Sequence, residues 1–419
     1  MRARAREADP IAVGLDLGTT KIAAVIAELE AEGECKVIGV GCSASEGLRR
    51  GVIIDVERTV QAVRRAVEAA ELMAGVQVNG VYAGLAGEHI DSCNSRGVVA
   101  VSGPGGEISP QDRERVIEAA RTVLVGGGRQ VLHVLPQEYF VDGQGGIRDP
   151  VGIAGVRLEA DVHLVTGAAT SIQNICNTIQ RAGLQVHRVV LEPLASSYAV
   201  LDEDEREMGV CLLDIGGGTT DVALFSLGSV HHTAVIGLGG QNVTNDVAVG
   251  LRTSWSQAEQ VKRQHGSALP DLVGKDEVIE VPGVAGRQPH PVPRRRLAAI
   301  IESRMEEILG MVRDDLRRAG FSRAPGAGVV LTGGGALLEG VVELAERVFD
   351  LPVRLGTPRV TRGMADRVSS PVFATAVGLV LYGREETSDE FGPEERPANR
   401  PSGGRHWWQG MIDWIQTFF

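Results

Sequence analysis

The sequence predicts a two-lobed α/β fold built on an internal duplication. Residues 11–27 read as an apolar strand, a Gly-Thr turn and a second apolar strand, and the same pattern returns at 210–228. The two stretches align on Asp16 and Asp214, and such self-similarity indicates a repeated unit. A chain of 419 residues is also too long for one compact core. We therefore expect two domains or one large bilobed unit.

The rest of the chain adds an insertion and a tail to this duplicated plan. Residues 88–166 mix strands with a helix that begins after Ser109 and Pro110, which predicts a small inserted domain. Residues 328–349 predict a strand, a third glycine-rich turn and an amphipathic helix. From 384 to 405 the chain is charged and rich in Pro, Gly and Ser, which is typical of a flexible linker.

Composition excludes several classes of protein. The net charge of -12 argues against nucleic-acid binding, because nucleic-acid-binding domains present a basic surface. Five cysteines without a C-x-x-C pair indicate neither a disulfide framework nor a zinc ribbon. The start of the chain has no apolar signal region, and no later apolar run approaches the roughly 20 residues that span a bilayer. We expect a protein of the reducing cytosol that does not cross the membrane.

The three glycine-rich stretches are suited to a nucleoside triphosphate. Backbone N–H groups meet phosphate oxygens closely only where glycine removes the side chain. Asp16 and Asp214 stand beside the first two turns, where carboxylates would hold hydrated Mg²⁺. Each turn taken singly is more often structural. The chain contains neither a G-x-x-x-x-G-K-[ST] motif nor a Rossmann G-x-G-x-x-G after the first strand.

The ordered set of turns resembles a known superfamily. The stretches GLDLGTTK, LLDIGGGTTDVAL and VVLTGGGALLEG are similar to the two phosphate motifs and the adenosine motif of actin, Hsp70 and the sugar kinases. Within that superfamily the chain resembles the FtsA family of bacterial cell-division proteins. Further stretches carry this likeness, among them LEPLASSYAVL, GLGGQNVTNDVAVGLRTSWSQAEQVKRQHG and the aromatic tail. The resemblance runs from about Val13 to Tyr382 and resumes at the tail.

The resemblance implies an actin-like bilobed fold of duplicated ribonuclease-H-like domains, with a 1C-type inserted domain and a C-terminal amphipathic helix. It assigns residues 10–87 and 167–204 to domain 1A, 88–166 to domain 1C, 205–232 and 307–383 to domain 2A, and 233–306 to domain 2B. The linker (384–405) and an amphipathic membrane-targeting helix (406–419) follow.

The resemblance also implies an ATP site with Mg²⁺. It places Gly18, Thr19, Thr20 and Lys21 in the first phosphate turn, Gly216, Gly217, Gly218 and Thr219 in the second, and Gly333, Gly334 and Gly335 in the adenosine turn. Asp16 and Asp214 would be catalytic residues, and their carboxylates would hold Mg²⁺ through water molecules.

Three further residues have two interpretations each. Glu259 and Lys262 match an E-x-x-K that contacts ribose and adenine in the superfamily, and the alternative is an exposed i,i+3 ion pair. Glu192 matches a glutamate near the attacking water, where it would orient the water or accept its proton. Its alternative is an acid at a helix N-terminus, before Pro193, that complements the helix dipole.

The aromatic ending predicts an amphipathic helix at a membrane surface. At about 100° per residue its apolar side chains fall in one arc of roughly 160°. These are Trp407, Trp408, Met411, Ile412, Trp414, Ile415, Phe418 and Phe419. The segment is too short to span a bilayer but suits its interface, where tryptophan is favoured. The alternative is a helix docked in a groove of the protein or a partner.

Together these features predict an adaptor with at most slow ATPase activity. The resemblance implies that it polymerises on the cytoplasmic side of the bacterial cell membrane at the division septum and recruits later division proteins. Domain 2B would bind the C-terminal peptide of FtsZ, with Arg296 and Arg304 meeting its carboxylates. The alternatives are a PilM-like pilus assembly ATPase and a sugar or acid kinase of the same superfamily.

Overall fold

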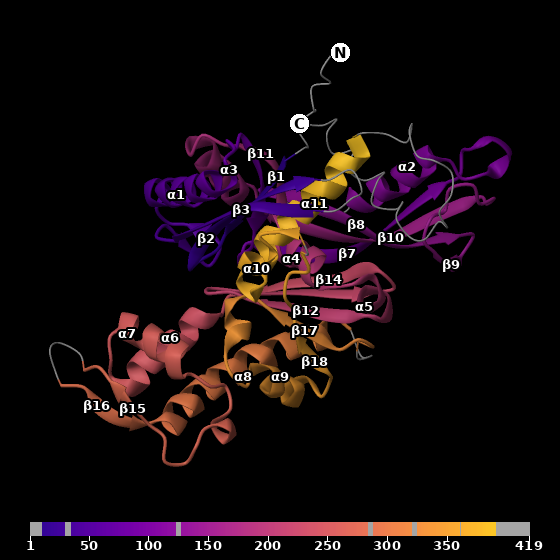
Figure 1. Cartoon of the computed structure of the whole chain (residues 1–419). Helices are drawn as coiled ribbons and strands as arrows, with labels where there is room; N and C mark the ends of the chain where they lie inside the picture. Colours follow the sequence, from indigo (N-terminus) through magenta and orange to yellow (C-terminus); the bar gives the residue numbers. More distant parts are fainter. Residues whose placement is uncertain are drawn as a thin grey trace.

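The computed structural model describes residues 11–29, 35–122, 127–283, 288–320, 325–360 and 362–390. Two lobes, each built on a mixed β-sheet, are joined to a third, smaller sheet that extends from the side of the first lobe (Figure 1). The tail residues 406–419, and the linker beyond residue 390, lie outside the described residues.

The first lobe is built on a six-stranded sheet of order β11-β6-β1-β2-β3-β19. Its strands are β1 (Ile11–Leu17), β2 (Lys21–Leu29), β3 (Cys35–Ala44), β6 (Gly80–Leu85), β11 (Gln185–Leu191) and β19 (Arg362–Gly363). β1 pairs antiparallel with β2 and parallel with β6. The predicted strand–turn–strand unit at residues 11–27 is confirmed.

The second lobe repeats this topology. Its strands are β12 (Val210–Ile215), β13 (Thr220–Ser226), β14 (Ser229–Ile236), β17 (Val329–Thr332) and β18 (Val353–Leu355), in the order β14-β13-β12-β17-β18. β12 pairs antiparallel with β13 and parallel with β17, as β1 does with β2 and β6. Asp16 and Asp214 are each the penultimate residue of the corresponding strand. The duplication read from the sequence is confirmed.

The pattern of β1 shows why helices cover both faces of the first sheet. Val13, Leu15 and Leu17 point to one face and are buried against α1 (Val56–Ala74) and α3 (Ala169–Arg181). On the opposite face β1 offers the small residues Ala12 and Gly14. There α4 (Glu192–Val200) and α11 (Ala374–Glu390) pack, and their core continues into the second lobe.

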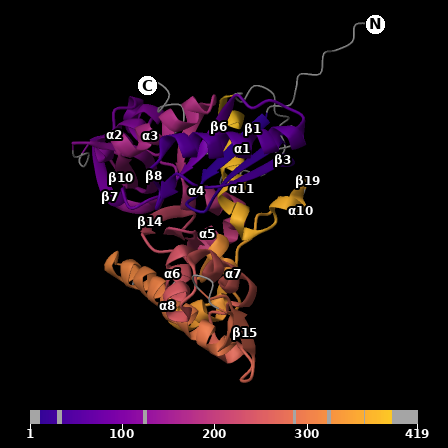
Figure 2. The same cartoon turned by 90° about the vertical axis from the view of Figure 1, so that its left-hand side faces the viewer.

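The helices of the second lobe lie at the end away from the first lobe (Figure 2). They are α6 (Gly240–Leu251), α7 (Trp255–His265), α8 (Arg294–Arg318) and α9 (Val341–Phe349), with the hairpin β15 (Val278–Val281) and β16 (His290–Pro293). The other short elements of this chain are β4 (Leu48–Arg49), β5 (Val52–Ile53), α5 (Glu203–Met208) and α10 (Ala365–Val368). Among the described residues, no helix combines the length and the apolar character needed to cross a membrane.

The inserted domain is a four-stranded antiparallel sheet with one helix. Its strands β7 (Ile90–Ala100), β8 (Arg129–Val141), β9 (Gln144–Ile147) and β10 (Arg157–Ala168) are ordered β7-β10-β8-β9. The helix α2 (Pro110–Arg121) begins as predicted, because the Ser109 side chain accepts a hydrogen bond from the backbone N–H of Asp112 and the carboxylate of Asp112 accepts one from the backbone N–H of Ser109.

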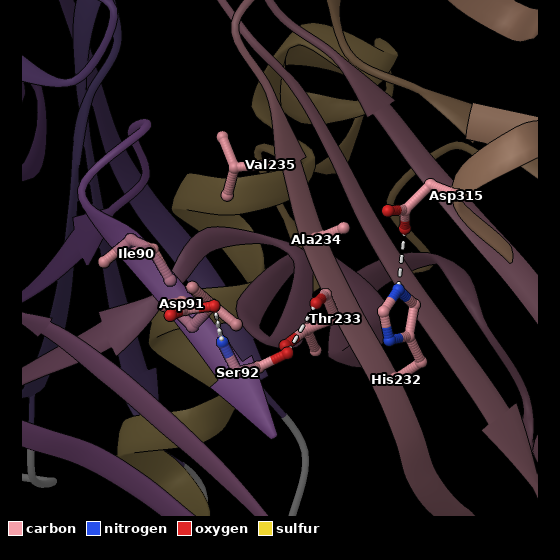
Figure 3. Close-up of a pocket in the computed structure, with 9 residues that line it drawn as sticks. Ile90, Asp91, Ser92, His232, Thr233, Ala234, Val235 and Asp315 are labelled. Atoms are coloured by element: carbon pink, nitrogen blue, oxygen red, sulfur yellow. Dashed lines mark hydrogen bonds and ion pairs between the residues drawn. The ribbon is translucent and has the colours of Figure 1, made fainter. Parts of the chain in front are cut away.

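The inserted domain contacts the edge strand β14 of the second lobe through polar groups. Ser92 Oγ donates to the carbonyl of Thr233 at 2.7 Å, and Gln137 Nε2 donates to that of Val230 at 2.9 Å. His163 is buried between them, with Nε2 2.9 Å from Thr233 Oγ1. A cavity of about 320 Å³ lies beside these contacts, where Asp91 and Asp315 approach from opposite sides (Figure 3).

The C-terminal helix differs from the sequence prediction in two ways. β19 pairs with β3, and α11 packs on β1 and α4, so residues assigned to the second lobe lie against the first. In addition α11 continues to Glu390, whereas the predicted linker begins at residue 384. The stretch REETSDE is polar but contains good helix formers, so it extends a helix that packing has already nucleated. The other domain limits stay a prediction.

Two helical glycines provide a matched test of this packing. A Cβ on Gly378 would overlap the carbonyl oxygen of Ala195, whereas a Cβ on Gly310 of α8 would meet no atom within 4 Å. We predict that Gly378→Ala lowers the free energy of unfolding by about 1–3 kcal/mol, because α11 must move away from α4. Gly310→Ala should raise it by about 0.5–1 kcal/mol through helix propensity.

Denaturant unfolding of the two variants measures both effects. A stabilised Gly378→Ala variant would contradict the close packing of α11 on α4.

Candidate functional site

The three glycine-rich turns lie against one another. Thr19 and Thr20 of the first turn face Gly218 and Gly217 of the second, so closely that a Cβ on Gly217 would overlap Thr20 Oγ1. Gly333 has a positive φ of 81° and lies against the Asp214 carboxylate, leaving no room for a side chain. Folding therefore places side by side three turns that are far apart in the sequence.

Asp16 and Asp214 are buried beside these turns. Lys21 Nζ lies 3.4 Å from Asp16 Oδ2, and Ser196 Oγ donates to Asp214 Oδ2 at 2.6 Å. Burial raises the pKa of Asp16, and the positive charge of Lys21 opposes that shift. Burial also raises the pKa of Asp214 to about 6, with hydrogen bonds from Ser196 and Thr375 acting in the opposite direction.

Glu192 joins the same cluster of acids. It is the first residue of α4, so its interpretation as an acid at a helix N-terminus is compatible with its position. Burial raises its pKa well above the ordinary value, and the nearby charges of Asp16, Asp221 and Asp214 add to the shift. Glu192 therefore lies at a helix N-terminus and also close to Asp16 and Asp214, so its position is compatible with both interpretations.

Asp221 is a member of the cluster that the sequence interpretation missed. It lies directly opposite Asp214 in the β12–β13 hairpin and is 2% exposed. Thr219 Oγ1 donates to Asp221 Oδ2 at 3.0 Å, while Oδ1 is buried without a hydrogen-bond partner among the described residues. Hairpin register was the available signal, because a four-residue turn at 216–219 places 214 opposite 221.

Glu259 and Lys262 support the second turn from the side of α7. Lys262 is 9% exposed, and its Nζ lies 2.7 Å from Glu259 Oε2 and 3.0 Å from the carbonyl oxygen of Gly240. The backbone N–H of Gly240 in turn donates to the carbonyl of Gly216 at 2.9 Å. The pair is thus an i,i+3 ion pair, as in the alternative interpretation, but Lys262 is buried and Glu259 is partly buried beside the turn.

The arrangement fits a polyphosphate with a divalent cation. Glycines line the two facing turns, and Lys21 contributes a positive charge next to Asp16. Four acids have raised pKa values, and three of them are buried while Glu192 is partly buried. Added positive charge would stabilise their carboxylate forms, including the buried Asp221 oxygen that has no hydrogen-bond partner among the described residues. Hard oxygen ligands of this kind are those that Mg²⁺ prefers.

The two arginines predicted to bind a partner lie on α8, and both reach α6. Arg304 Nε donates to Asp246 Oδ2 at 2.5 Å and Nη2 donates to Oδ1 at 3.2 Å. Arg296 is exposed and donates to the carbonyl of Gly250 at 3.1 Å. The guanidinium of Arg304 therefore already binds a carboxylate bidentately within this chain.

The fold and the site together define the actin-like class of proteins. Comparison with solved structures supports this class. The chain resembles a PilM–PilN type IV pilus biogenesis complex with a TM-score of 0.65 at 17% identity, covering 89% of this chain and 98% of that one. It resembles MreB5 of Spiroplasma citri bound to ADP with a TM-score of 0.53 at 13% identity, covering 91% and 99%. At these identities the likeness concerns the fold alone.

Sequence comparison identifies the particular family. Residues 211–378 match the family model described as cell division protein FtsA, and residues 87–166 match the SHS2 domain inserted in FtsA. The chain is 47% identical to the cell division protein FtsA of Pseudomonas aeruginosa over 90% of each chain, and 42% identical to that of Escherichia coli K12 over 98% of each. The chain belongs to the FtsA family of cell-division proteins.

The raised pKa of Asp214 makes a prediction about stability. The unfolded chain releases this proton near pH 4 and the folded chain near pH 6, so between these values the folded state binds more protons. The free energy of unfolding therefore falls as the pH rises through that window, and the loss persists above it. We predict that Asp214→Asn stabilises the ligand-free protein by about 1–3 kcal/mol at pH 7.5, but hardly at pH 4.

Denaturant unfolding of both proteins at the two pH values checks this. An equal stabilisation at both pH values would show that ionisation of Asp214 is not its cause.

Proposed function

We propose that this chain binds ATP with Mg²⁺, assembles into polymers at the cytoplasmic face of the cell membrane, and anchors the FtsZ ring there during division. The observation that carries nucleotide binding is the contact between the two glycine turns, each beside a buried aspartate, in a member of the FtsA family. The structures of MreB5 are described as bound to ADP and to AMPPNP, which agrees with this assignment.

Each part of the site has a role in the proposed complex. The backbone N–H groups of residues 18–21 and 216–219 would bind phosphate oxygens, and Lys21 would neutralise part of their charge. Asp16 and Asp214 would hold Mg²⁺ through water. The adenosine would lie on Gly333–Gly335, with Glu259 and Lys262 near its ribose and base. Mg²⁺ supplies charge neutralisation of the phosphates when it is bound.

Glu192 is proposed to orient the attacking water or accept its proton. Burial raises the pKa of Glu192, so its carboxylate accepts a proton more readily than that of an exposed glutamate. We expect slow hydrolysis, since the family role is an adaptor in cell division. The PilM-like alternative has less support, because its likeness is one of fold at 17% identity. A kinase would need a base facing a second substrate, and none has been assigned.

Nucleotide binding is tested with one pair of aspartate variants. Asp214→Ala should weaken Mg²⁺–ATP binding by at least about tenfold, because a charged ligand-holding group is lost. Asp276→Ala removes an exposed carboxylate of the second lobe and should leave binding unchanged. Titration with a fluorescent ATP analogue measures both. Wild-type affinity in Asp214→Ala would sink the assignment, and Glu192→Gln should slow hydrolysis while it preserves binding.

The tail is proposed to bind the membrane by insertion of its apolar arc. Its polar face carries Asp413 and no lysine, so attraction to anionic lipid contributes little. One tail then binds reversibly, and joining many tails in a polymer raises the overall affinity without new contacts. This gives assembly a physical purpose at the membrane.

Membrane binding is tested by comparing variants that each add one negative charge at a different position of the tail. Trp408→Glu and Phe418→Glu each place a carboxylate in the apolar arc and should release the full chain from vesicles. Gln416→Glu adds the same charge on the polar face and should largely retain binding. Vesicle co-sedimentation reports the difference. If all three variants remain bound, the tail docks on protein instead.

Domain 2B is proposed to bind the acidic C-terminal peptide of FtsZ through α8. Because Arg304 already pairs with Asp246, reversing its charge would also repel α6, and a loss of binding would have two explanations. Arg296 is exposed and its bond to Gly250 engages one nitrogen only, so its guanidinium has capacity for a carboxylate. Arg296 is therefore the sharper probe.

The peptide site is tested by fluorescence anisotropy at low salt, where ion pairs contribute most. Arg296→Glu should lower peptide affinity by about tenfold or more, as expected for a charge-assisted pair. For Arg304, the double variant Arg304→Asp with Asp246→Arg restores the internal ion pair in reverse. Wild-type affinity in Arg296→Glu would place the peptide elsewhere, and recovery in the double variant would make the role of Arg304 structural.

A further inference from the structure

One oxygen of Asp214 is held by hydroxyl groups from two different helices. Ser196 Oγ donates to Asp214 Oδ2 at 2.6 Å, and Thr375 Oγ1 donates to the same oxygen at 3.2 Å. The two hydroxyl oxygens lie 3.1 Å apart. All three residues are buried, with 0%, 6% and 7% of Ser196, Thr375 and Asp214 exposed. The network is therefore closed to solvent on this side.

The three groups come from elements that belong to different parts of the fold. Asp214 lies on β12 in the sheet of the second lobe. Ser196 lies on α4, and Thr375 is the second residue of α11, and both helices pack on the first sheet. The other oxygen, Oδ1, faces Gly333 of the third turn. One carboxylate thus contacts the second lobe's turn on one side and the first lobe's helices on the other.

The helix α11 is packed without a layer of flexible side chains. A Cβ on Gly14 would overlap the carbonyl of Ala376, and a Cβ on Gly378 would overlap that of Ala195, so the backbones of β1, α11 and α4 are in contact. Closely packed backbones move together rather than deform. A shift at the N-terminal end of α11 is for this reason passed along the helix.

The other end of α11 is packed on aromatic rings. Tyr382 contacts Tyr198 edge-on with ring centroids 5.8 Å apart, and Tyr82 at 6.2 Å. Arg206 of α5 lies over the Tyr198 ring at 5.1 Å, which extends the contact to the second lobe. After Glu390 the chain leads to the proposed membrane-binding tail. Along the sequence, α11 therefore joins Thr375 at the carboxylate site to the segment that leads to the tail.

We propose that Ser196 and Thr375 are positioning residues for Asp214, and that Thr375 couples the state of the phosphate turns to α11. The inference rests on the proposed nucleotide site and concerns its regulation. Holding Oδ2 with two donors fixes the orientation of the carboxylate, so that Oδ1, on the side of Gly333, is the oxygen that would bind a hydrated cation. A cation bound at Oδ1 would withdraw negative charge from Oδ2 and weaken the hydrogen bond that Oδ2 accepts from Thr375. Because Thr375 lies at the start of α11, this change would reach the helix.

The first experiment measures ATP affinity of the full chain with Mg²⁺ and with EDTA. Thr375→Val removes the hydroxyl with little change in shape, whereas Thr375→Ser keeps it. We expect Thr375→Val to weaken binding by about tenfold with Mg²⁺ and much less with EDTA, as for a lost hydrogen bond to a charged group. Thr375→Ser should restore affinity. Thr178→Val removes a buried helical hydroxyl that bonds only the carbonyl of Asn174, and should change neither value.

The second experiment tests the coupling by amide hydrogen exchange in α11. Addition of Mg²⁺–ATP should change protection in residues 376–390 of the wild type and of Thr375→Ser, and this change should be lost in Thr375→Val at saturating nucleotide. Protection in α8, which lies in the second lobe, serves as the internal reference.

The outcomes separate the inference from the function on which it rests. If the wild type binds no ATP, the proposed function fails and the inference fails with it. If the wild type binds ATP and Thr375→Val loses equal affinity with Mg²⁺ and with EDTA, Thr375 has a merely structural role. If α11 exchanges identically with and without nucleotide in the wild type, the coupling is overturned even though binding stands.

Discussion

A cluster of four acids, three of them buried and one partly buried, beside one ammonium group is the constraint on which the structure depends. Asp16, Glu192, Asp214 and Asp221 arrive from β1, α4, β12 and β13, and each has a pKa raised first by burial. Lys21 contacts one of them. Such a cluster opposes folding of the ligand-free chain, because charge is taken out of water and the contacts with Lys21 and with neighbouring hydroxyl groups offset only part of that cost. Folds retain such strain where a ligand relieves it, which is the reason for proposing the nucleotide site at this cluster.

Local sequence patterns predicted the duplication, but they did not predict the packing of α11 on the first sheet. The two hairpins were recognised because strand alternation and the glycine turns are short-range signals, and aligning them gave Asp16 and Asp214 directly. The position of α11 could not be derived in this way. Its sequence shows a helix, but sequence order does not say which sheet a helix covers, and α11 packs on β1, more than three hundred and fifty residues earlier.

The site shows the same division between local and long-range signals. The glycine turns and their aspartates were predicted, whereas Ser196 and Thr375 were not, because a lone hydroxyl in an apolar helix gives no signal until another element supplies its partner. The pairing of Arg304 is a second long-range contact of this kind. The basic run on α8 does not indicate a partner for Arg304, because that partner, Asp246, lies 58 residues earlier in the sequence, on the neighbouring helix α6.

Two kinds of contact join the parts of the fold, namely close apolar packing and hydrogen bonds between polar groups. The free-energy cost of separating the parts differs between them. The contact of α11 with α4 and β1 is apolar and so close that glycines are required, and separating it would open a cavity in the core. The inserted domain contacts β14 mainly by hydrogen bonds such as those of Ser92 and Gln137, beside a polar cavity. Water can replace such bonds at a small net cost, whereas it cannot replace close packing. The inserted domain is thus able to separate from the second lobe while α11 remains fixed to the first.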